Sequence, residues 1–354
     1  MIHKMNKRIR KLLEEKEKEN EKLCVDAQNV LITGGAGTVG FALAKYLLEQ
    51  YQDKNVVLLD RNDAALYYCM KTLNRYDNVS FYLGDYADED LFEQIVNDYG
   101  IDTVFHCAAY KIVPLVDLNP IEALKNNTIQ CNHFFTMCGK AGIKSCIFMS
   151  SYEAYIPKNV FGETKRIAEI LMEKNAQNYP NTKYCAFRFG FILNSSGSVI
   201  HIFEEQAKKG QDLTVTHREI ERYVCSASEV VRGSLLLIGL GETGYTYTLN
   251  MEEPVKIYDL AEYYCNKYQN KNQIIITQLR PGDKIYEELL GCEGGFIKTE
   301  DNILFKNKKI YVNWKAFEKN YNILHNHIAK NSKENIRDII RQCAKDTAEI
   351  GDSA

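Results

Sequence analysis

Short apolar runs alternate with amphipathic segments through the first 190 residues of the chain. Six of these runs, rich in branched and aromatic residues, have the length of buried strands: VLIT, VVLLD, VSFYLGD, TVFHCAA, CIFMS and YCAFRFG. The segments between them have the periodicity of helices that cover a sheet. The pattern predicts an α/β fold with a parallel, doubly wound sheet, which binds its ligand at the carboxyl ends of the strands.

The first predicted strand leads into a glycine-rich turn, VLITGGAGTVG, with Gly34, Gly37 and Gly40. Glycine at these positions permits a tight turn, close approach of the backbone to a pyrophosphate, and close packing of helix on strand. The pyrophosphate would rest on the positive amino end of the following helix. Asp60, at the end of VVLLD, would accept hydrogen bonds from the adenosine ribose and repel a 2′-phosphate. The motif predicts NAD as cofactor, although the neighbouring Arg61 weakens the discrimination against NADP.

Composition narrows the classes of partner. The 354 residues include 44 basic and 47 acidic side chains, a net charge of −3, so no electrostatic footprint for nucleic acid or an anionic membrane is expected. No apolar run approaches the length of a membrane span and no secretory signal is recognised, which predicts a cytoplasmic protein. The eleven cysteines include no C-x-x-C pair, and residues such as Cys107, Cys146 and Cys185 lie in apolar runs, as buried free thiols do. We expect no metal site.

The pattern divides the chain into an arm, two domains and a tail. Ile2, Met5, Ile9 and Leu12 make a thin apolar stripe on a charged helix, typical of a solvated helix or a packing arm. The predicted units are a helical arm at 1–27, a Rossmann-type NAD-binding domain at 28–190 completed by about 225–250, a smaller substrate-binding α/β domain at 191–224 and 251–330, and a C-terminal helix and tail at 331–354. Within the last two units, helices are expected near 256–268 and 331–349.

From about residue 28 to 300 the chain resembles the extended short-chain dehydrogenase/reductases. Within them it is similar to the soluble branch of the polysaccharide-biosynthesis nucleotide-sugar 4,6-dehydratases that modify UDP-N-acetylglucosamine. The motifs that carry the resemblance are TGGAGTVG, HCAAYKIVPLVDLNPIEALKNN, NVFGETKRIAE, GSVIHIF, LTVTHREIERY and LRPGDKIYEELL. It implies oxidation of sugar C4, loss of water across C5 and C6, and return of the hydride to C6. It also implies a homodimer or larger homo-oligomer, formed through helices near 120–140 and 158–178.

The ends of the predicted strands, together with the resemblance, give the expected cofactor site. Asp85 and Tyr86, in GDYADED, lie where the adenine would bind, although Asp85 is equally suited to cap a helix. The small residues after the fourth strand permit close approach of the cofactor. The predicted cofactor set is Gly34, Gly37, Thr38, Val39, Gly40, Asp60, Arg61, Asp85, Tyr86, Ala108, Ala109, Tyr110 and Lys165.

The acid and base positions depart from those of the family. Relatives read Ser-Thr-Asp-Lys-Ala after the CIFMS strand, whereas this chain reads Ser150-Ser151-Tyr152-Glu153-Ala154. This run resembles the S-T-D-E-V-Y segment of the dTDP-glucose 4,6-dehydratases, in which the glutamate is the C5 base. Glu153 is the leading base candidate, with helix capping or a surface ion pair as the alternative. Tyr152 replaces the acid of the relatives and is either a proton donor or a packing residue.

The following helix carries the second departure. The usual Tyr-x-x-x-Lys appears as Phe161-Gly-Glu-Thr-Lys165, so the lysine remains and the catalytic phenol is lost. Lys165 should still bind the nicotinamide ribose. Ser151, Tyr152 or Tyr155 would then relay the proton of the C4 hydroxyl, although Tyr155 could equally belong to the core.

Substrate contacts follow from the same resemblance. Arg222 and Arg280 match positions that face the nucleotide diphosphate, and guanidinium groups suit phosphate oxygens, although either could form a structural ion pair. The predicted substrate set is Lys111, Phe191, Ser198, Arg222 and Arg280. Phe191 replaces a family asparagine, which leaves the sugar undefined. His201 and His217 lack metal-ligand spacing and are interpreted as loop residues.

Three functions stay open on the sequence. The first is an NAD-dependent nucleotide-sugar 4,6-dehydratase with altered acid and base residues. The second keeps only oxidation at C4, as in a 4-dehydrogenase or 4-epimerase. The third is a non-catalytic protein that binds NAD or a nucleotide sugar, motivated by the loss of the usual aspartate and tyrosine.

Overall fold

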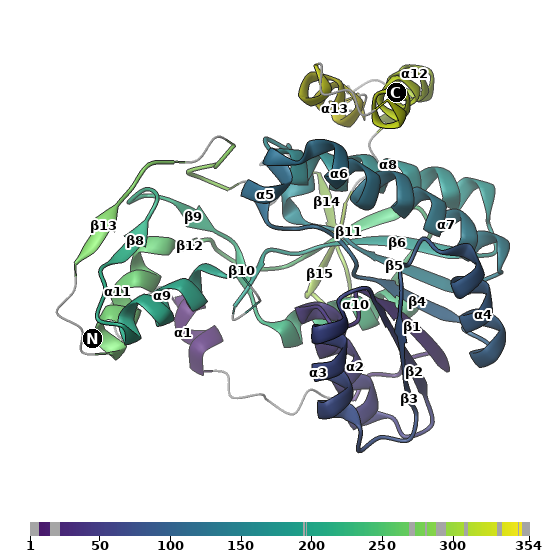
Figure 1. Cartoon of the computed structure of the whole chain (residues 1–354), viewed down its shortest axis with the longest axis horizontal. Helices are drawn as coiled ribbons and strands as arrows, with labels where there is room; N and C mark the ends of the chain where they lie inside the picture. Colours follow the sequence, from purple (N-terminus) through teal and green to yellow (C-terminus); the bar gives the residue numbers. More distant parts are fainter. Residues whose placement is uncertain are drawn as a thin grey trace.

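A nine-stranded sheet forms the centre of the molecule, with helices on both faces (Figure 1). The computed structural model describes residues 7–14, 22–193, 195, 197–268, 273–279, 282–287, 295–307, 311–330, 335–345 and 347–348. Six parallel strands match the predicted ones: β1 (Asn29–Thr33), β2 (Asn55–Asp60), β3 (Val79–Leu83), β4 (Thr103–His106), β5 (Ser145–Met149) and β6 (Lys183–Arg188). The sheet continues through β11 (Tyr245–Leu249), β15 (Leu304–Asn307) and β14 (Phe296–Lys298). The strand order is β14-β15-β11-β6-β5-β4-β1-β2-β3, and only the pairs that include β15 are antiparallel.

The order 3-2-1-4-5-6 is that of a Rossmann-type doubly wound sheet, so the predicted fold class is confirmed. Alternate side chains of β1 point to opposite faces of the sheet, and both faces are covered. Val30 and Ile32 belong to one core cluster and Leu31 to the other. The first face is covered by α2 (Thr38–Gln50), α3 (Asp63–Leu73) and α10 (Ala227–Leu240); the second by α4 (Glu89–Tyr99), α7 (Cys131–Lys140) and α8 (Val160–Asn178).

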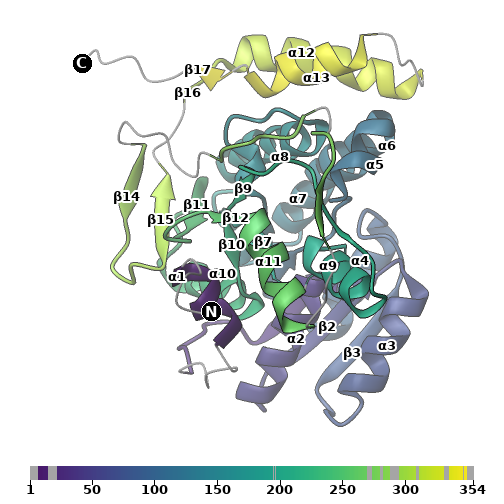
Figure 2. The same ribbon diagram turned by 90° about the vertical axis from the view of Figure 1, so that its left-hand side faces the viewer.

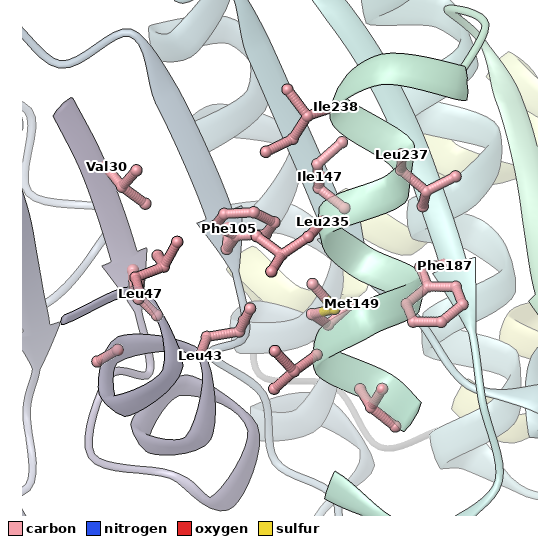
Figure 3. Close-up of a cluster of buried hydrophobic side chains, with 14 of the residues drawn as sticks. Val30, Leu43, Leu47, Phe105, Ile147, Met149, Phe187, Leu235, Leu237 and Ile238 are labelled. Atoms are coloured by element: carbon pink, nitrogen blue, oxygen red, sulfur yellow. The ribbon is translucent and has the colours of Figure 1, made fainter. Parts of the chain in front are cut away.

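Figure 3 shows the first of these cores, where α2 and α10 meet the sheet. Leu43 and Leu47 of α2 and Leu235 of α10 pack with Phe105 and Ile147 of the central strands. All five side chains are buried, so this interface fixes the amino end of α2 against the sheet.

A smaller unit lies to one side of the sheet, on the left in Figure 1. It contains α9 (Val199–Lys208), α11 (Ile257–Lys267), β8 (Leu213–Val215), β9 (Glu221–Arg222), β12 (Val255–Lys256) and β13 (Ile274–Ile276). Two-residue strands β7 (Phe191–Ile192) and β10 (Val224–Cys225) pair beside it. The amino-terminal helix α1 (Lys7–Glu14) packs here through Ile9 and Leu12, with buried Arg8 bonded to Glu229 at 2.8 Å. The expected residues Ile2 and Met5 lie outside the described residues.

The predicted division of the chain differs from the structure after residue 295. Residues 295–307 form β14 and β15 in the main sheet, although the sequence placed 251–330 in the smaller domain. The segment was misassigned because exposed edge strands such as FIK lack the long apolar run of a buried strand. Two further helices, α12 (Trp314–Ala329) and α13 (Ile336–Lys345), lie over α8, and two-residue strands β16 (Tyr311–Val312) and β17 (Thr347–Ala348) pair beyond them (Figure 2).

The α12 and α13 pair covers α8 with an apolar core of its own. Phe317, Leu324 and Ile340 pack with Ile167 and Leu171 of α8. Short helices α5 (Val113–Leu118) and α6 (Pro120–Leu124) complete this cluster before a π-helical turn, Lys125–Gln130. One of the two helices on which self-association was expected therefore has an apolar face covered within the chain itself.

We predict that Gly40→Ala destabilises the protein because of the close helix-to-strand packing at α2. An added Cβ would overlap the Gly34 carbonyl oxygen and lie 2.8 Å from the Gly35 Cα, both backbone atoms. The expected loss is about 1–3 kcal/mol in free energy of unfolding, measured by chemical denaturation. Gly239→Ala in α10 is the control, because its Cβ meets nothing within 4 Å and alanine favours a helix. Equal stability of the two variants would contradict the prediction.

Adjacent residues of α12 test the cover over α8. Leu324 is 0% exposed and Ile323 is 37% exposed. We expect Leu324→Ala to lower the free energy of unfolding by about 2–5 kcal/mol, because it leaves a cavity under the helix pair. Ile323→Ala should change it by less than about 1 kcal/mol. A small effect of Leu324→Ala would mean that α12 does not rest on α8 in solution.

Candidate functional site

One cavity of about 600 Å³ opens at the carboxyl ends of β1, β2, β4 and β5. Its wall includes the loops that follow these strands, and the smaller unit closes its far side through Ser198, Ile202 and Arg222. This volume is within the range of roughly 300–1,000 Å³ typical of ligand sites. The edge of the sheet that the sequence predicted as a binding edge is thus the edge that holds the cavity.

The glycine turn forms one end of the cavity. Gly34 has φ +65°, and a Cβ there would lie 2.6 Å from the Ala108 backbone nitrogen, so two loops approach each other closely. Gly37 is the N-cap residue of α2 and, having no side chain, makes no side-chain cap hydrogen bond. The first-turn N–H groups therefore belong to a glycine cradle at a positive helix end, which suits a pyrophosphate.

Asp60 closes the second strand beside this cradle. One carboxylate oxygen accepts the Ala36 N–H at 3.0 Å and the other accepts the Asn62 N–H at 2.9 Å. Arg61 points to Asp85 at 3.5 Å and lies 4.5 Å from the centre of the Tyr110 ring. Because Arg61 already pairs with Asp85, its attraction for the 2′-phosphate of NADP is reduced.

The π-helical turn, Lys125–Gln130, holds the loop that forms the wall opposite the glycine turn. The Asn127 side chain accepts the Tyr110 N–H and donates to the Tyr110 carbonyl, both at 2.9 Å. The buried Tyr86 hydroxyl donates to the Asn126 carbonyl. These two asparagines were not predicted as site residues, although they stand in the KNN segment of the family motif; they fix the loop that carries Ala108 and Ala109.

A buried charge cluster fixes the end of β5. Glu169 of α8 accepts from Arg188 of β6 at 2.5 and 2.7 Å, from Arg166 at 3.2 Å and from the Ser150 hydroxyl at 2.7 Å. Burial by itself would raise the pKa of Glu169, but the two guanidinium groups, Arg188 first, hold that pKa below its usual value. The cluster ties β5, β6 and α8 together where the candidate catalytic residues begin.

Glu153 lies in a 3-10 turn, Tyr152–Ala154, directly after β5. It is 7% exposed, lines the cavity, and accepts from the Asn159 side chain at 3.3 Å, with the Lys284 ammonium 3.9 Å away. Ser151 caps the turn, because its hydroxyl accepts the Glu153 N–H at 3.2 Å. Glu153 caps no helix and its ion pair is buried, so neither alternative interpretation describes it.

Tyr152 joins Glu153 to a second carboxyl group. Its hydroxyl lies 3.2 Å from Glu153 Oε1 and 3.1 Å from Glu287 Oε1, and Glu287 also lies 3.2 Å from Arg222. Burial, together with the two glutamates, raises the pKa of Tyr152 well above its usual value. The phenol therefore stays protonated at neutral pH.

The amino end of α8 brings Phe161 and Lys165 to the cavity. A Cβ on Gly162 would overlap the Glu153 carbonyl oxygen, so glycine lets the helix touch the 3-10 turn. Lys165 donates to the Met149 carbonyl at 2.8 Å, and burial lowers its pKa to about 8. Phe161 also lines the cavity and offers no proton at the position where relatives have a phenol.

The substrate end is lined by Lys111, Phe191, Ser198 and Arg222. The Arg222 Nη1 donates to the Lys284 carbonyl at 2.6 Å and to the Glu221 carbonyl at 2.7 Å, besides pairing with Glu287. These contacts hold the guanidinium within the protein, which favours a structural role for Arg222 over that of a free phosphate ligand. Ser198 caps α9, and Arg280 lies outside the described residues.

Most of the predicted site residues meet at this cavity. The predicted residues that line it are Gly34, Gly37, Thr38, Val39, Gly40, Asp60, Arg61, Asp85, Tyr86, Ala108, Ala109, Tyr110, Lys111, Ser151, Tyr152, Glu153, Lys165, Phe191, Ser198 and Arg222. Tyr155 is absent from the lining and lies 5.8 Å from the Arg188 guanidinium, so its predicted relay role has no geometric support. Among the polar residues that the sequence analysis missed are Asn126, Asn127, Asn159, Asp283, Lys284 and Glu287.

The described residues hold neither a metal-ligand cluster nor a membrane-spanning helix. Among them, no three His, Cys, Asp or Glu side chains cluster as metal ligands would. In the same part of the chain, every helix is too short or too polar to cross a membrane. His201 lies in α9, which corrects its interpretation as a loop residue. His217 accepts the Glu219 N–H at 3.1 Å, and the ten described cysteines are free thiols.

Comparison with known proteins gives relatives of the same kind. A probable polysaccharide biosynthesis protein, EpsC of Bacillus subtilis, is 35% identical over 75% of this chain, which spans 45% of that protein. A UDP-N-acetylglucosamine 4,6-dehydratase (inverting) of Campylobacter jejuni is 27% identical over 77% of this chain and 80% of its own length. The solved structure of Pen from Bacillus thuringiensis has a TM-score of 0.75 at 27% identity, covering 81% of this chain and 88% of that one.

The chain thus spans less than half of the first curated relative, whereas it matches most of the Campylobacter protein and of Pen. A family model described as polysaccharide biosynthesis protein matches residues 30–309, which include the whole cavity. On this match, the chain belongs to the polysaccharide biosynthesis protein family, a branch of the extended short-chain dehydrogenase/reductases.

Proposed function

We propose that the protein is an NAD-dependent nucleotide-sugar 4,6-dehydratase. The observation that carries the proposal is Glu153, a buried carboxylate that lines the same cavity as the glycine cradle. A base in that place can remove a proton from a sugar held against the cofactor. The names of the Campylobacter relative and of the family agree with a nucleotide-sugar substrate.

The residues of the cradle fit NAD. The positive amino end of α2, with glycine as its N-cap residue, suits the pyrophosphate, and Asp60 has lone pairs left for the ribose hydroxyls beyond its two backbone contacts. The Lys165 ammonium, from α8, lies at the end of β5, where it would hold the nicotinamide ribose. When bound, the nicotinamide would take a hydride from a sugar carbon and later return it.

We assign acid and base catalysis to residues of the 3-10 turn, Tyr152–Ala154. A ketone at C4 acidifies the C5 proton, which the Glu153 carboxylate accepts. The Asn159 amide and the Lys284 ammonium contact Oε2 of this carboxylate, the Tyr152 hydroxyl contacts Oε1, and the side chain lines the cavity. Ser151 keeps its own O–H proton while it accepts from Glu153 N–H, and it is the group we assign to the C4 hydroxyl.

At the proposed substrate end of the cavity, the shape of the wall would contribute more to the choice of sugar than its charge would. Phe191 is 39% exposed at the cavity and lies 6.0 Å from Tyr152, ring to ring. Because Arg222 is held by Glu287, the diphosphate would depend on Lys111 and on Arg280 for positive charge. The cytoplasm is the compartment in which we expect this reaction, with the enzyme working as a homo-oligomer.

Glu153→Gln tests the base. We expect a fall of about 100-fold or more in 4-keto-6-deoxy product, because an amide cannot accept the C5 proton. Product and deuterium at C5 are measured in D2O across UDP-, GDP-, CDP- and dTDP-sugars. The variant should bind NAD and nucleotide sugar as the unmodified chain does.

The same assay separates the alternatives. Inversion at C4, or accumulation of NADH without loss of water, would replace the dehydratase with an epimerase or a dehydrogenase. Ligand binding without turnover of any sugar would leave a non-catalytic binder. Undiminished dehydration by Glu153→Gln would exclude Glu153 as the base.

Asp60→Asn tests cofactor choice. We expect NAD affinity to fall about tenfold, because a ribose hydroxyl loses a charged acceptor, and NADP affinity to rise as repulsion of the 2′-phosphate disappears. Isothermal titration with both dinucleotides measures the two changes. Asp63→Asn, which removes an exposed charge on α3 outside the cavity, is the matched control. An unchanged NAD to NADP ratio in Asp60→Asn would contradict the assignment.

A further inference from the structure

Two buried carboxyl groups meet at one hydroxyl beside the cavity. The Tyr152 oxygen lies within 3.2 Å of both Glu153 and Glu287. A phenol has one proton and can donate it to only one carboxylate. The other contact is a hydrogen bond only when that carboxyl is protonated and donates to the phenol oxygen. The geometry therefore calls for one proton on the pair of glutamates.

Burial and charge place this proton on Glu287. Its side chain is 0% exposed, and its Oε2 has no hydrogen-bond partner among the described residues. Burial, followed by the charge of Glu153, raises the pKa of Glu287 to about 7 against the opposing effects of Arg222 and Lys284. Asp283 also lies 4.0 Å from the Arg222 guanidinium, so Glu287 shares this positive charge with another acidic side chain.

Glu153 has the opposite surroundings. It lies at the cavity wall, with Asn159 and Lys284 as its remaining partners. An ionised Glu153 accepts from Tyr152, and a protonated Glu287 donates to Tyr152. The order of donors is therefore Glu287, Tyr152, Glu153, and every contact at the hydroxyl is satisfied.

We propose that Glu287 stores the proton that Tyr152 delivers to the departing 6-hydroxyl, while Glu153 acts as the base at C5. This inference rests on the proposed dehydration. Tyr152 is the group that contacts the sugar, and Glu287 is a positioning residue that acts through it. The departing group needs an acid, and the chain has a phenol where relatives have a carboxylic acid; a protonated carboxyl behind the phenol restores that acid.

The step balances in protons and electrons. Glu153 takes the C5 proton, the C6–O bond breaks, and the oxygen leaves as water with the Tyr152 proton. Glu287 passes its proton to Tyr152. Glu153 later returns its proton to C5. The proton of the C4 hydroxyl leaves through Ser151 to solvent during oxidation, and Glu287 takes one proton from solvent after elimination. One hydride leaves C4 and one returns to C6 through the proposed NAD, so no further oxidant is needed.

Glu287→Gln in the full chain separates the two roles. We expect C4 oxidation and deuterium exchange at C5 to stay within about threefold, because Glu153 remains, while elimination falls about 100-fold. In the unmodified chain, elimination should fall as pH rises above about 7 and Glu287 ionises; the variant should lack this change. Equal losses of exchange and elimination, or no loss of elimination, would overturn the proposal.

Two variants complete the design. Tyr152→Phe breaks the path with Glu287 in place and should give the same split between exchange and elimination. Glu163→Gln is the matched control, because burial raises the pKa of this α8 carboxyl to about 7 as well, yet it lies outside the cavity. It should leave the split and the pH profile unchanged. A change of both in Glu163→Gln would mean that any buried carboxyl produces the effect.

A measurement without substrate locates the proton directly. In infrared spectra of protein with ¹³C-labelled glutamate, protonated carboxyl bands of Glu287 and Glu163 should both titrate near pH 7. The Glu287 band is the component that disappears in Glu287→Gln and persists in Glu163→Gln. An ionised Glu287 at pH 6 would overturn the inference. If the unmodified chain oxidises no nucleotide sugar, the proposed dehydratase fails, while this titration still decides whether the pair holds a proton.

Discussion

The active end of the cavity depends on the buried carboxylate of Glu169. Three elements converge on it: β5 through Ser150, β6 through Arg188, and α8 through Arg166 and Glu169 itself. Removal of one partner from such a buried cluster leaves uncompensated charge, at a cost of about 3–5 kcal/mol. The cluster fixes the direction in which the chain leaves β5, and hence where Ser151, Tyr152 and Glu153 lie relative to Lys165.

Charge is distributed differently at the two ends of the cavity. Asp60 is held by two backbone N–H groups, which supply no charge of their own, so its carboxylate remains an uncompensated anion at the cradle. Glu153 and Glu287, by contrast, lie among Lys284, Arg222 and the Tyr152 hydroxyl. A fixed charge suits recognition of a ribose, whereas a cluster of interacting groups suits proton transfer, because small changes in its surroundings move the proton.

Local patterns were enough to predict the sheet and the cradle. The apolar runs of β1, β2, β4, β5 and β6 are mostly buried and therefore stand out, and VSFYL of the edge strand β3 is apolar although only partly buried. Each glycine of the turn has a steric reason that can be stated without coordinates. The edge strands β14 and β15 and the helix α12 escaped because half-exposed elements have weaker patterns. Glu287 escaped for another reason: it lies 135 residues from Tyr152, and nothing local reports a contact across that distance.

The residues at positions 152, 153 and 161 differ from those of the relatives, and the three differences have one physical explanation. Phe161 lines the cavity at the start of α8, where a hydroxyl would otherwise need a partner. In this chain a phenol lies instead in the 3-10 turn, where the Tyr152 hydroxyl contacts the carboxyl groups of both Glu153 and Glu287. A carboxylic acid at 152 would place three acidic groups within hydrogen-bond reach, a costly arrangement in a buried site. A phenol avoids this repulsion because it remains neutral, and it still offers one proton. A neutral phenol at 152 is thus compatible with the proposed base at 153, and the proposed proton on Glu287 would compensate for its weak acidity.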